Sequence, residues 1–79
     1  MNSYEENIMD RAYQSFVMGG DVFTLNFPTG KKAYEKQLYV EAAQNLEKEG
    51  MVEIGNITEK RMRMRITEKG IDFGNRQSL

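Results

Sequence analysis

Six consecutive residues, from Arg61 to Ile66, alternate strictly between arginine and an apolar side chain. A period of two is typical of a β-strand, because successive side chains point to opposite faces. The run therefore predicts a strand whose Met62, Met64 and Ile66 face a core while the arginines face solvent. An earlier strand, with Val52 and Ile54 inward and Ile57 as a further inward candidate, completes a β-hairpin, in which Gly55-Asn56 or Thr58-Glu59 supplies the bend.

The N-terminal third of the chain predicts a helix followed by a strand. Ser3 and Glu6 match the Ser-x-x-Glu capping box, and Gly19-Gly20 ends a helix that we place at about residues 4–18. The apolar stripe along this helix consists of Ile8, Met9, Ala12, Tyr13, Phe16 and Val17. Residues 21–27 then alternate as a short strand does, before a turn at Pro28-Thr29-Gly30.

Residues 31–49 contain neither proline nor glycine, and an apolar residue recurs every four positions in Tyr34, Leu38, Ala42 and Leu46. This spacing predicts helix. The helix is either continuous or broken near Lys36 or Gln37, and periodicity alone does not decide between the two.

The C-terminal residues predict a short last helix. Thr67 is a candidate N-cap, and Ile71 and Phe73 are its apolar residues. Gly70 and Gly74 should weaken this helix, because glycine has a low helix propensity. We expect residues 75–79 to form a frayed tail.

Composition limits the possible functions. With 79 residues, 39% of them hydrophobic and 29% charged, the chain is expected to fold as one globular domain over residues 1–79. It contains no cysteine and no histidine, which excludes disulfides, thiolate metal sites and Ser-His catalytic triads. No apolar run approaches the roughly 18 residues that span a bilayer, and the N-terminus lacks a signal-peptide pattern. We therefore expect a cytoplasmic protein, not an enzyme, with no cofactor, metal site or membrane association.

The formal net charge of −1 is unevenly distributed along the chain. Residues 1–28 hold one base and four acids, which gives −3, and residues 29–59 hold four bases and six acids, which gives −2. Residues 60–79 hold six bases and two acids, which gives +4. The chain as a whole is not basic, so a nucleic-acid site would have to be a local basic stripe.

Two local motifs resemble the winged helix-turn-helix proteins, including the MarR-like and PadR-like regulators. The run Leu46-Glu47-Lys48-Glu49-Gly50-Met51-Val52 resembles the end of a recognition helix and the entry to the wing. The run Ile66-Thr67-Glu68-Lys69-Gly70, with Phe73 three residues on, resembles the end of the second wing strand and the cap of the next helix. The resemblance implies an α+β winged-helix fold and a DNA-binding regulator of transcription.

On this interpretation, double-stranded DNA would be contacted by two sets of residues. The wing contributes Lys60, Arg61, Arg63 and Arg65, whose cations suit phosphates and guanine edges. The recognition segment contributes Lys36, Gln37, Glu41, Gln44 and Asn45. In the alternative interpretation, the arginines are the solvated outer face of a strand, and the segment is an ordinary amphipathic helix.

Protein partners are the other possibility. Four aromatic residues are more than a small core is expected to cover: Tyr4, Tyr13, Phe16 and Phe23. Those left exposed on the first helix would form a homodimer interface, unless all four complete the core. The acidic pI of about 5.4 and the glutamates of the recognition segment support an adaptor that uses the same scaffold without binding DNA. Glu47, Glu49 and Glu53 lie close in sequence, but nothing supplies the cleft that paired catalytic carboxylates require.

Overall fold

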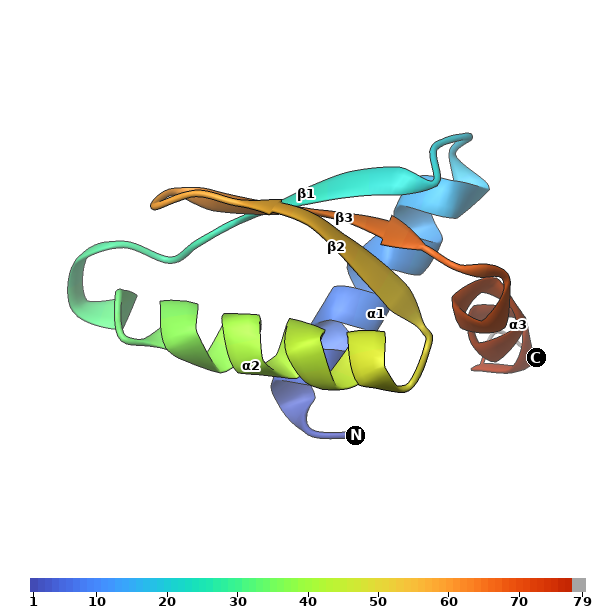
Figure 1. Cartoon of the computed structure of the whole chain (residues 1–79), viewed down its shortest axis with the longest axis horizontal. Coiled ribbons are helices and arrows are strands. Elements are labelled where there is room, and N and C mark those ends of the chain that lie inside the picture. The colour runs from blue at the N-terminus through green and yellow to red at the C-terminus, as the bar shows by residue number, and fades with distance from the viewer. Residues whose placement is uncertain (78–79) are drawn as a thin grey trace.

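The computed structural model describes residues 1–77, which form three α-helices and a three-stranded antiparallel sheet. The elements are α1 (Ser3–Val17), β1 (Val22–Asn26), the 3-10 turn η1 (Gly30–Lys32), α2 (Glu35–Lys48), β2 (Val52–Ile57), β3 (Arg61–Ile66) and α3 (Glu68–Gln77). The strand order is β1-β3-β2, so β3 is central and pairs with both neighbours. The helices cover one face of the sheet and leave the other face open (Figure 1). The expected α+β class and the β-hairpin are confirmed.

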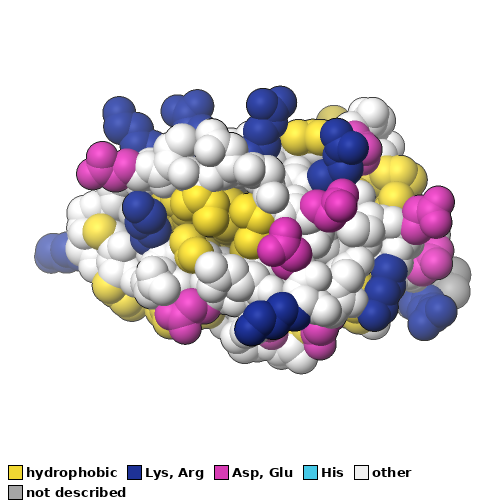
Figure 2. Space-filling view, viewed as in Figure 1, with side chains coloured by type: hydrophobic (Ala, Val, Ile, Leu, Met, Phe, Trp, Pro, Cys, Tyr) yellow, Lys and Arg dark blue, Asp and Glu magenta, His cyan; other side chains and the backbone are white. Residues whose placement is uncertain are grey.

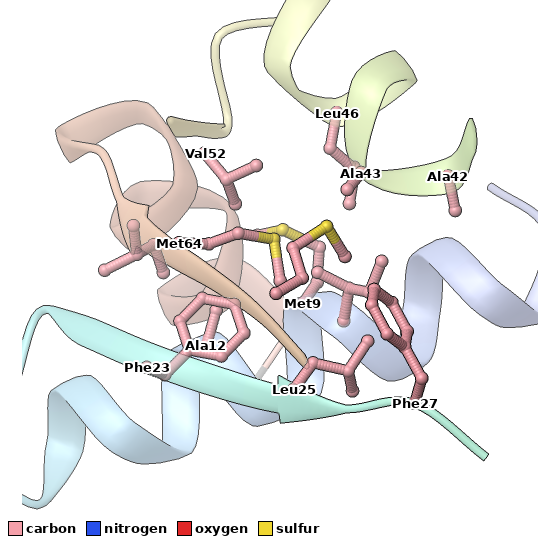
Figure 3. Packing of buried hydrophobic residues seen from close by; sticks show 13 residues of the cluster. Met9, Ala12, Phe23, Leu25, Phe27, Ala42, Ala43, Leu46, Val52 and Met64 are labelled. Carbon is pink, nitrogen blue, oxygen red and sulfur yellow. The ribbon is translucent and has the colours of Figure 1, made fainter. Parts of the chain in front are cut away.

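The core lies between the inner face of the sheet and the helices (Figure 3). The inward methionines of β3 are almost completely buried, with Met62 at 0% and Met64 at 1% exposure, as the alternation predicts. Leu25 of β1, Val52 of β2 and Leu46 of α2 meet them from the neighbouring elements. Ile57 is an exception, because it is 41% exposed near the hairpin turn. The arginines of β3 consequently face away from every helix.

The capping box of α1 forms one residue earlier than the sequence predicts. The side chain of Asn2, not Ser3, accepts a hydrogen bond from Glu5 N at 2.8 Å, and the Glu5 carboxylate accepts one from Asn2 N at 2.8 Å. Asparagine caps a helix as well as serine does, and the two pairs have the same spacing. The choice of Ser3 and Glu6 was therefore wrong by one position.

Residues 31–49 do not form one continuous helix. A single 3-10 turn, η1, precedes a 14-residue helix, α2, and the residues between them continue the turn without a side-chain cap. A helix-turn-helix pair in this region would therefore consist of a 3-10 turn and α2, and no full α-helix lies between β1 and α2.

The last helix is longer than the sequence predicts. Asn75, Arg76 and Gln77 belong to α3, so the expectation of fraying is wrong for them, while residues 78 and 79 lie outside the described residues. Thr67 caps the helix as expected, because its Oγ accepts a hydrogen bond from Gly70 N at 3.1 Å. Gly70 and Gly74 are both buried and lie against neighbouring elements. A Cβ at Gly74 would overlap the Tyr13 ring, so close packing compensates for the low helix propensity of glycine.

Candidate nucleic-acid interface

The outer face of the sheet carries the predicted arginine row. Arg61, Arg63 and Arg65 are exposed on the central strand, and their β-strand spacing gives a row about 13 Å long. The strand register places polar side chains beside most of the row: Asn26 opposite Arg61, Thr24 and Asn56 on either side of Arg63, and Val22 and Glu53 on either side of Arg65. None of the helices formed by residues 1–77 covers this face, so the arginines are accessible to a ligand (Figure 1).

One end of the row is partly neutralised. Arg65 Nε lies 3.7 Å from Asp21 Oδ2, and Glu53 stands opposite Arg65 on β2. Within residues 1–77, Arg61 and Arg63 form no ion pair. The positive charge of the row therefore lies toward the β2–β3 turn.

The turn end of the sheet adds further cations. Lys60 lies in the β2–β3 turn, and its carbonyl accepts a hydrogen bond from Phe27 N at 2.9 Å, which ties the turn to the segment after β1. Lys31 and Lys32 follow in η1, at the same end of the molecule (Figure 1). Figure 2 shows Lys and Arg side chains projecting along the sheet side and at this end. We refer to Lys31, Lys32, Lys60, Arg61 and Arg63 as the basic patch.

The turn itself has a defined shape. Thr58 N donates to the carbonyl of Arg61 at 2.8 Å, and Thr58 Oγ accepts from Arg61 N at 3.1 Å and from Lys60 N at 3.3 Å. These bonds fix the backbone from which Lys60 and Arg61 project. The exposed Glu59 in the same turn is the acidic neighbour of the patch.

Sequence reasoning missed Lys31 and Lys32. Counting charge by segment placed them in the acidic stretch 29–59, and the strand pairing that brings η1 to the hairpin end is not visible in the sequence. The one indication in the sequence was that residues 21–27 and residues 61–66 both alternate as strands do, so that the two segments could pair in one sheet.

The predicted recognition segment faces the opposite side of the molecule. α2 packs on the inner face of the sheet through Ala42, Ala43 and Leu46. Its exposed residues, which include Gln37, Glu41, Gln44 and Asn45, therefore point away from the sheet, as the 3.6-residue period requires. The arginine row and the exposed flank of α2 therefore lie on different sides of the fold, because the helix covers the face that the arginines leave, and the structure does not bring the two sets of predicted DNA contacts together.

Lys36 has a local role that the sequence does not reveal. Its side chain is half-buried, and its Nζ lies 5.3 Å from the centroid of the Phe27 ring. A cation over an aromatic face is electrostatically favourable. Lys36 therefore helps to hold α2 to the end of β1, in contrast to the exposed Lys31 and Lys32.

The glutamates near the end of α2 do not gather into one site. Glu47 Oε2 accepts a hydrogen bond from Ile54 N at 2.8 Å and so protects the free edge of β2. Glu53 lies on the outer face of the sheet beside Arg65. Among the described residues, no group of three or more acidic side chains is arranged to hold a metal ion. In residues 1–77, no helix is long and apolar enough to cross a membrane.

The aromatic residues of the first third belong mainly to the core. Phe23 is buried, and Tyr4 and Tyr13 are half-buried against the core cluster. Tyr4 Oη donates to Glu35 Oε2 at 3.0 Å, and desolvation together with this hydrogen bond raises the pKa of Tyr4 above 10.0. Exposed apolar side chains remain at the end of α1, where Phe16, Val17 and Met18 are 36%, 64% and 86% exposed.

The exposed side chains of the outer face are of types that can bind anions and base edges. Guanidinium groups bind phosphate oxygens and guanine edges in a forked geometry, and asparagine amides match adenine edges. The face offers both types of side chain beside one another on a rigid sheet. The chain matches no protein-family model, no curated protein and no solved structure.

Proposed function

We propose that the protein is a small DNA-binding regulator of transcription, and that it binds duplex DNA through the outer face of its sheet and the basic patch. The observation that carries the proposal is the row of exposed arginines on the central strand, of which Arg61 and Arg63 form no ion pair within residues 1–77. Asp21 and Glu53 at the other end of the row repel phosphates, so DNA is expected at the turn end.

The scaffold is proposed to be a winged helix. The element order of helix, strand, helix, hairpin and helix supports this assignment, with α2 in the position of the recognition helix and β2–β3 as the wing. The principal contact then shifts from the helix to the sheet. α2 points away from the arginines, so one straight duplex on the outer face does not reach Gln37, Glu41 or Gln44.

The strength of binding should depend steeply on salt. The five cations of the basic patch neutralise about five phosphate charges, which predicts a slope of log K against log salt of about −4.5. Affinity for a random duplex should then fall about 500-fold between about 50 mM and about 200 mM salt.

The test is fluorescence anisotropy on a mixed-sequence duplex of about 20 base pairs over this salt range. We expect the double variant Arg61→Ala/Arg63→Ala to bind more weakly to all sequences, with a slope reduced to about −2.7. The matched control is Lys48→Ala, which removes an exposed cation from α2. If the double variant binds as the wild type does, while its circular dichroism is unchanged, the proposal is wrong.

A protein-binding adaptor is the second candidate. The exposed Val17 and Met18 favour it, because they line a groove of about 1070 Å³ between α1, β1 and α3, and the exposed Phe16 lies next to them in sequence. Complete absence of duplex binding at low salt would support this second function. Of the four aromatic residues predicted for a homodimer interface, Phe16 belongs to this exposed set, whereas Phe23 is buried and Tyr4 and Tyr13 are half-buried.

A further inference from the structure

We infer that, where the duplex presents guanine, Arg61 and Arg63 exchange their phosphate contacts for base contacts in the major groove and recognise guanine, so that the sheet reads the bases and α2 does not. This inference rests on the proposed DNA binding and names the substrate: guanine-containing duplex DNA. It differs from the helix-based readout that the winged-helix resemblance implies, and it follows from the shape of the outer face.

On the outer face, the arginines of the central strand β3 form a ridge, and the shorter side chains of the flanking strands β1 and β2 form a lower shoulder on each side. The longest side chains, the arginines, stand on the central strand, while the flanking Thr24, Asn26 and Asn56 are short. Neighbouring strands lie about 4.8 Å apart, so the two shoulders are separated by about 10 Å. The major groove is about 12 Å wide and the minor groove about 6 Å. The arginine ridge can therefore enter the major groove while the shoulders lie at its rims, and the minor groove is too narrow for the ridge.

The chemistry of the ridge matches base edges as well as phosphates. Arginine binds O6 and N7 of guanine through two hydrogen bonds, and asparagine binds N6 and N7 of adenine. Arg63 stands between Thr24 and Asn56, and Arg61 stands beside Asn26. Directly opposite side chains in a sheet lie about 5 Å apart at Cβ, which is close enough for them to contact adjacent bases.

A β-bulge sets this arrangement. The register of β2 shifts between Ile54 and Asn56, so that Asn56 stands opposite Arg63. Gly55 contributes no side chain, and a shallow hollow of about 320 Å³ remains beside it, lined by Glu53, Arg63 and Arg65 among others. Bulges re-aim side chains, and here the bulge places an amide beside Arg63.

The same face is poorly suited to single strands and to RNA. Its described side chains in the strand register include no aromatic ring, whereas single-strand binders stack bases on rings. The major groove of duplex RNA is deep and narrow, and side chains do not read it. The geometry therefore points to duplex DNA.

The experiment compares two otherwise identical mixed-sequence DNA duplexes. One contains guanine and the other contains 7-deazaguanine, which lacks the N7 acceptor but keeps base pairing, phosphates and the minor groove. We expect the wild type to bind the guanine duplex about 5- to 150-fold more tightly, since this is the range for a bidentate base contact. The double variant Arg61→Lys/Arg63→Lys keeps both charges and loses both forks, so it should bind the deaza duplex as the wild type does and lose most of the preference.

The controls separate this inference from the proposed function. Arg76→Lys makes the same chemical change in α3 and should leave the preference intact. Major-groove readout would be overturned if the wild type bound both duplexes equally, or if it bound duplex RNA as tightly as duplex DNA. In either case the proposed DNA binding itself would still stand. Failure of the wild type to bind any duplex at low salt would overturn the proposed function as well.

Discussion

The substitution Gly70→Ala tests how α3 is held against the hairpin. A Cβ at this position would overlap the carbonyl oxygen of Met51 and would lie 2.8 Å from Cγ1 of Ile66. The Met51 carbonyl is anchored, because it accepts hydrogen bonds from Thr67 N at 3.1 Å and from Thr67 Oγ at 2.9 Å. The added methyl group must therefore displace α3 and not a flexible side chain.

The expected loss of stability is about 2 kcal/mol. Overpacking of a buried site costs about 1–3 kcal/mol, and anchored backbone places this site at the upper end. Alanine recovers about 1 kcal/mol through its higher helix propensity. For a chain of this length, a loss of about 2 kcal/mol lowers the melting temperature by about 8–16 °C.

Thermal unfolding followed by circular dichroism measures this effect, and urea titration gives the free energy directly. The matched control is Asp72→Ala in the same helix, which changes an exposed position and should alter stability by less than about 0.5 kcal/mol. If Gly70→Ala melts at the wild-type temperature or above it, the close contact between α3 and Met51 does not exist.

Three further changes test other contacts. Asp21→Asn should release Arg65 to bind one further phosphate, tighten DNA binding and steepen the salt slope by about 0.9, as anisotropy would measure; unchanged binding would contradict the neutralisation of Arg65 by Asp21. Glu47→Ala should cost about 1 kcal/mol and speed hydrogen exchange at Ile54 N, and unchanged exchange would contradict the edge contact. Folding raises the pKa of Tyr4 above 10.0. The contribution of protonated Tyr4 to the stability of the folded state is therefore complete below pH 10.0, and it is lost as the pH rises through the raised pKa. Tyr4→Phe should therefore lose less stability than the wild type in urea titrations above pH 10.0, and equal losses would refute the assignment.

Local patterns in the sequence predicted the elements better than their relative placement. The alternation in residues 61–66 fixed which side of β3 is buried, because a strand with a period of two has only two faces. The four-residue spacing in residues 31–49 likewise identified Ala42 and Leu46 as core residues, but its other two members, Tyr34 and Leu38, are exposed. Neither pattern contains the information that α2 lies on the face opposite the arginines, since that depends on contacts between distant segments.

Contacts between distant segments also explain why the last helix was expected to be weaker than it is and why part of the basic patch was missed. Propensity alone makes Gly70 and Gly74 weak points, whereas tertiary contacts make them positions where a larger residue does not fit. Lys31 and Lys32 are unremarkable in sequence and become part of the candidate site only through the pairing of β1 with β3. Interactions that span the chain override local preference in both cases.

The most direct test of the central claim is an NMR titration of the isotope-labelled protein with duplex DNA, which maps the bound face residue by residue. The account predicts that amide and side-chain signals of Thr24, Asn26, Arg61 and Arg63 shift, while those of Gln37, Glu41 and Gln44 do not. Shifts confined to the exposed flank of α2, with the outer face of the sheet unchanged, would contradict it.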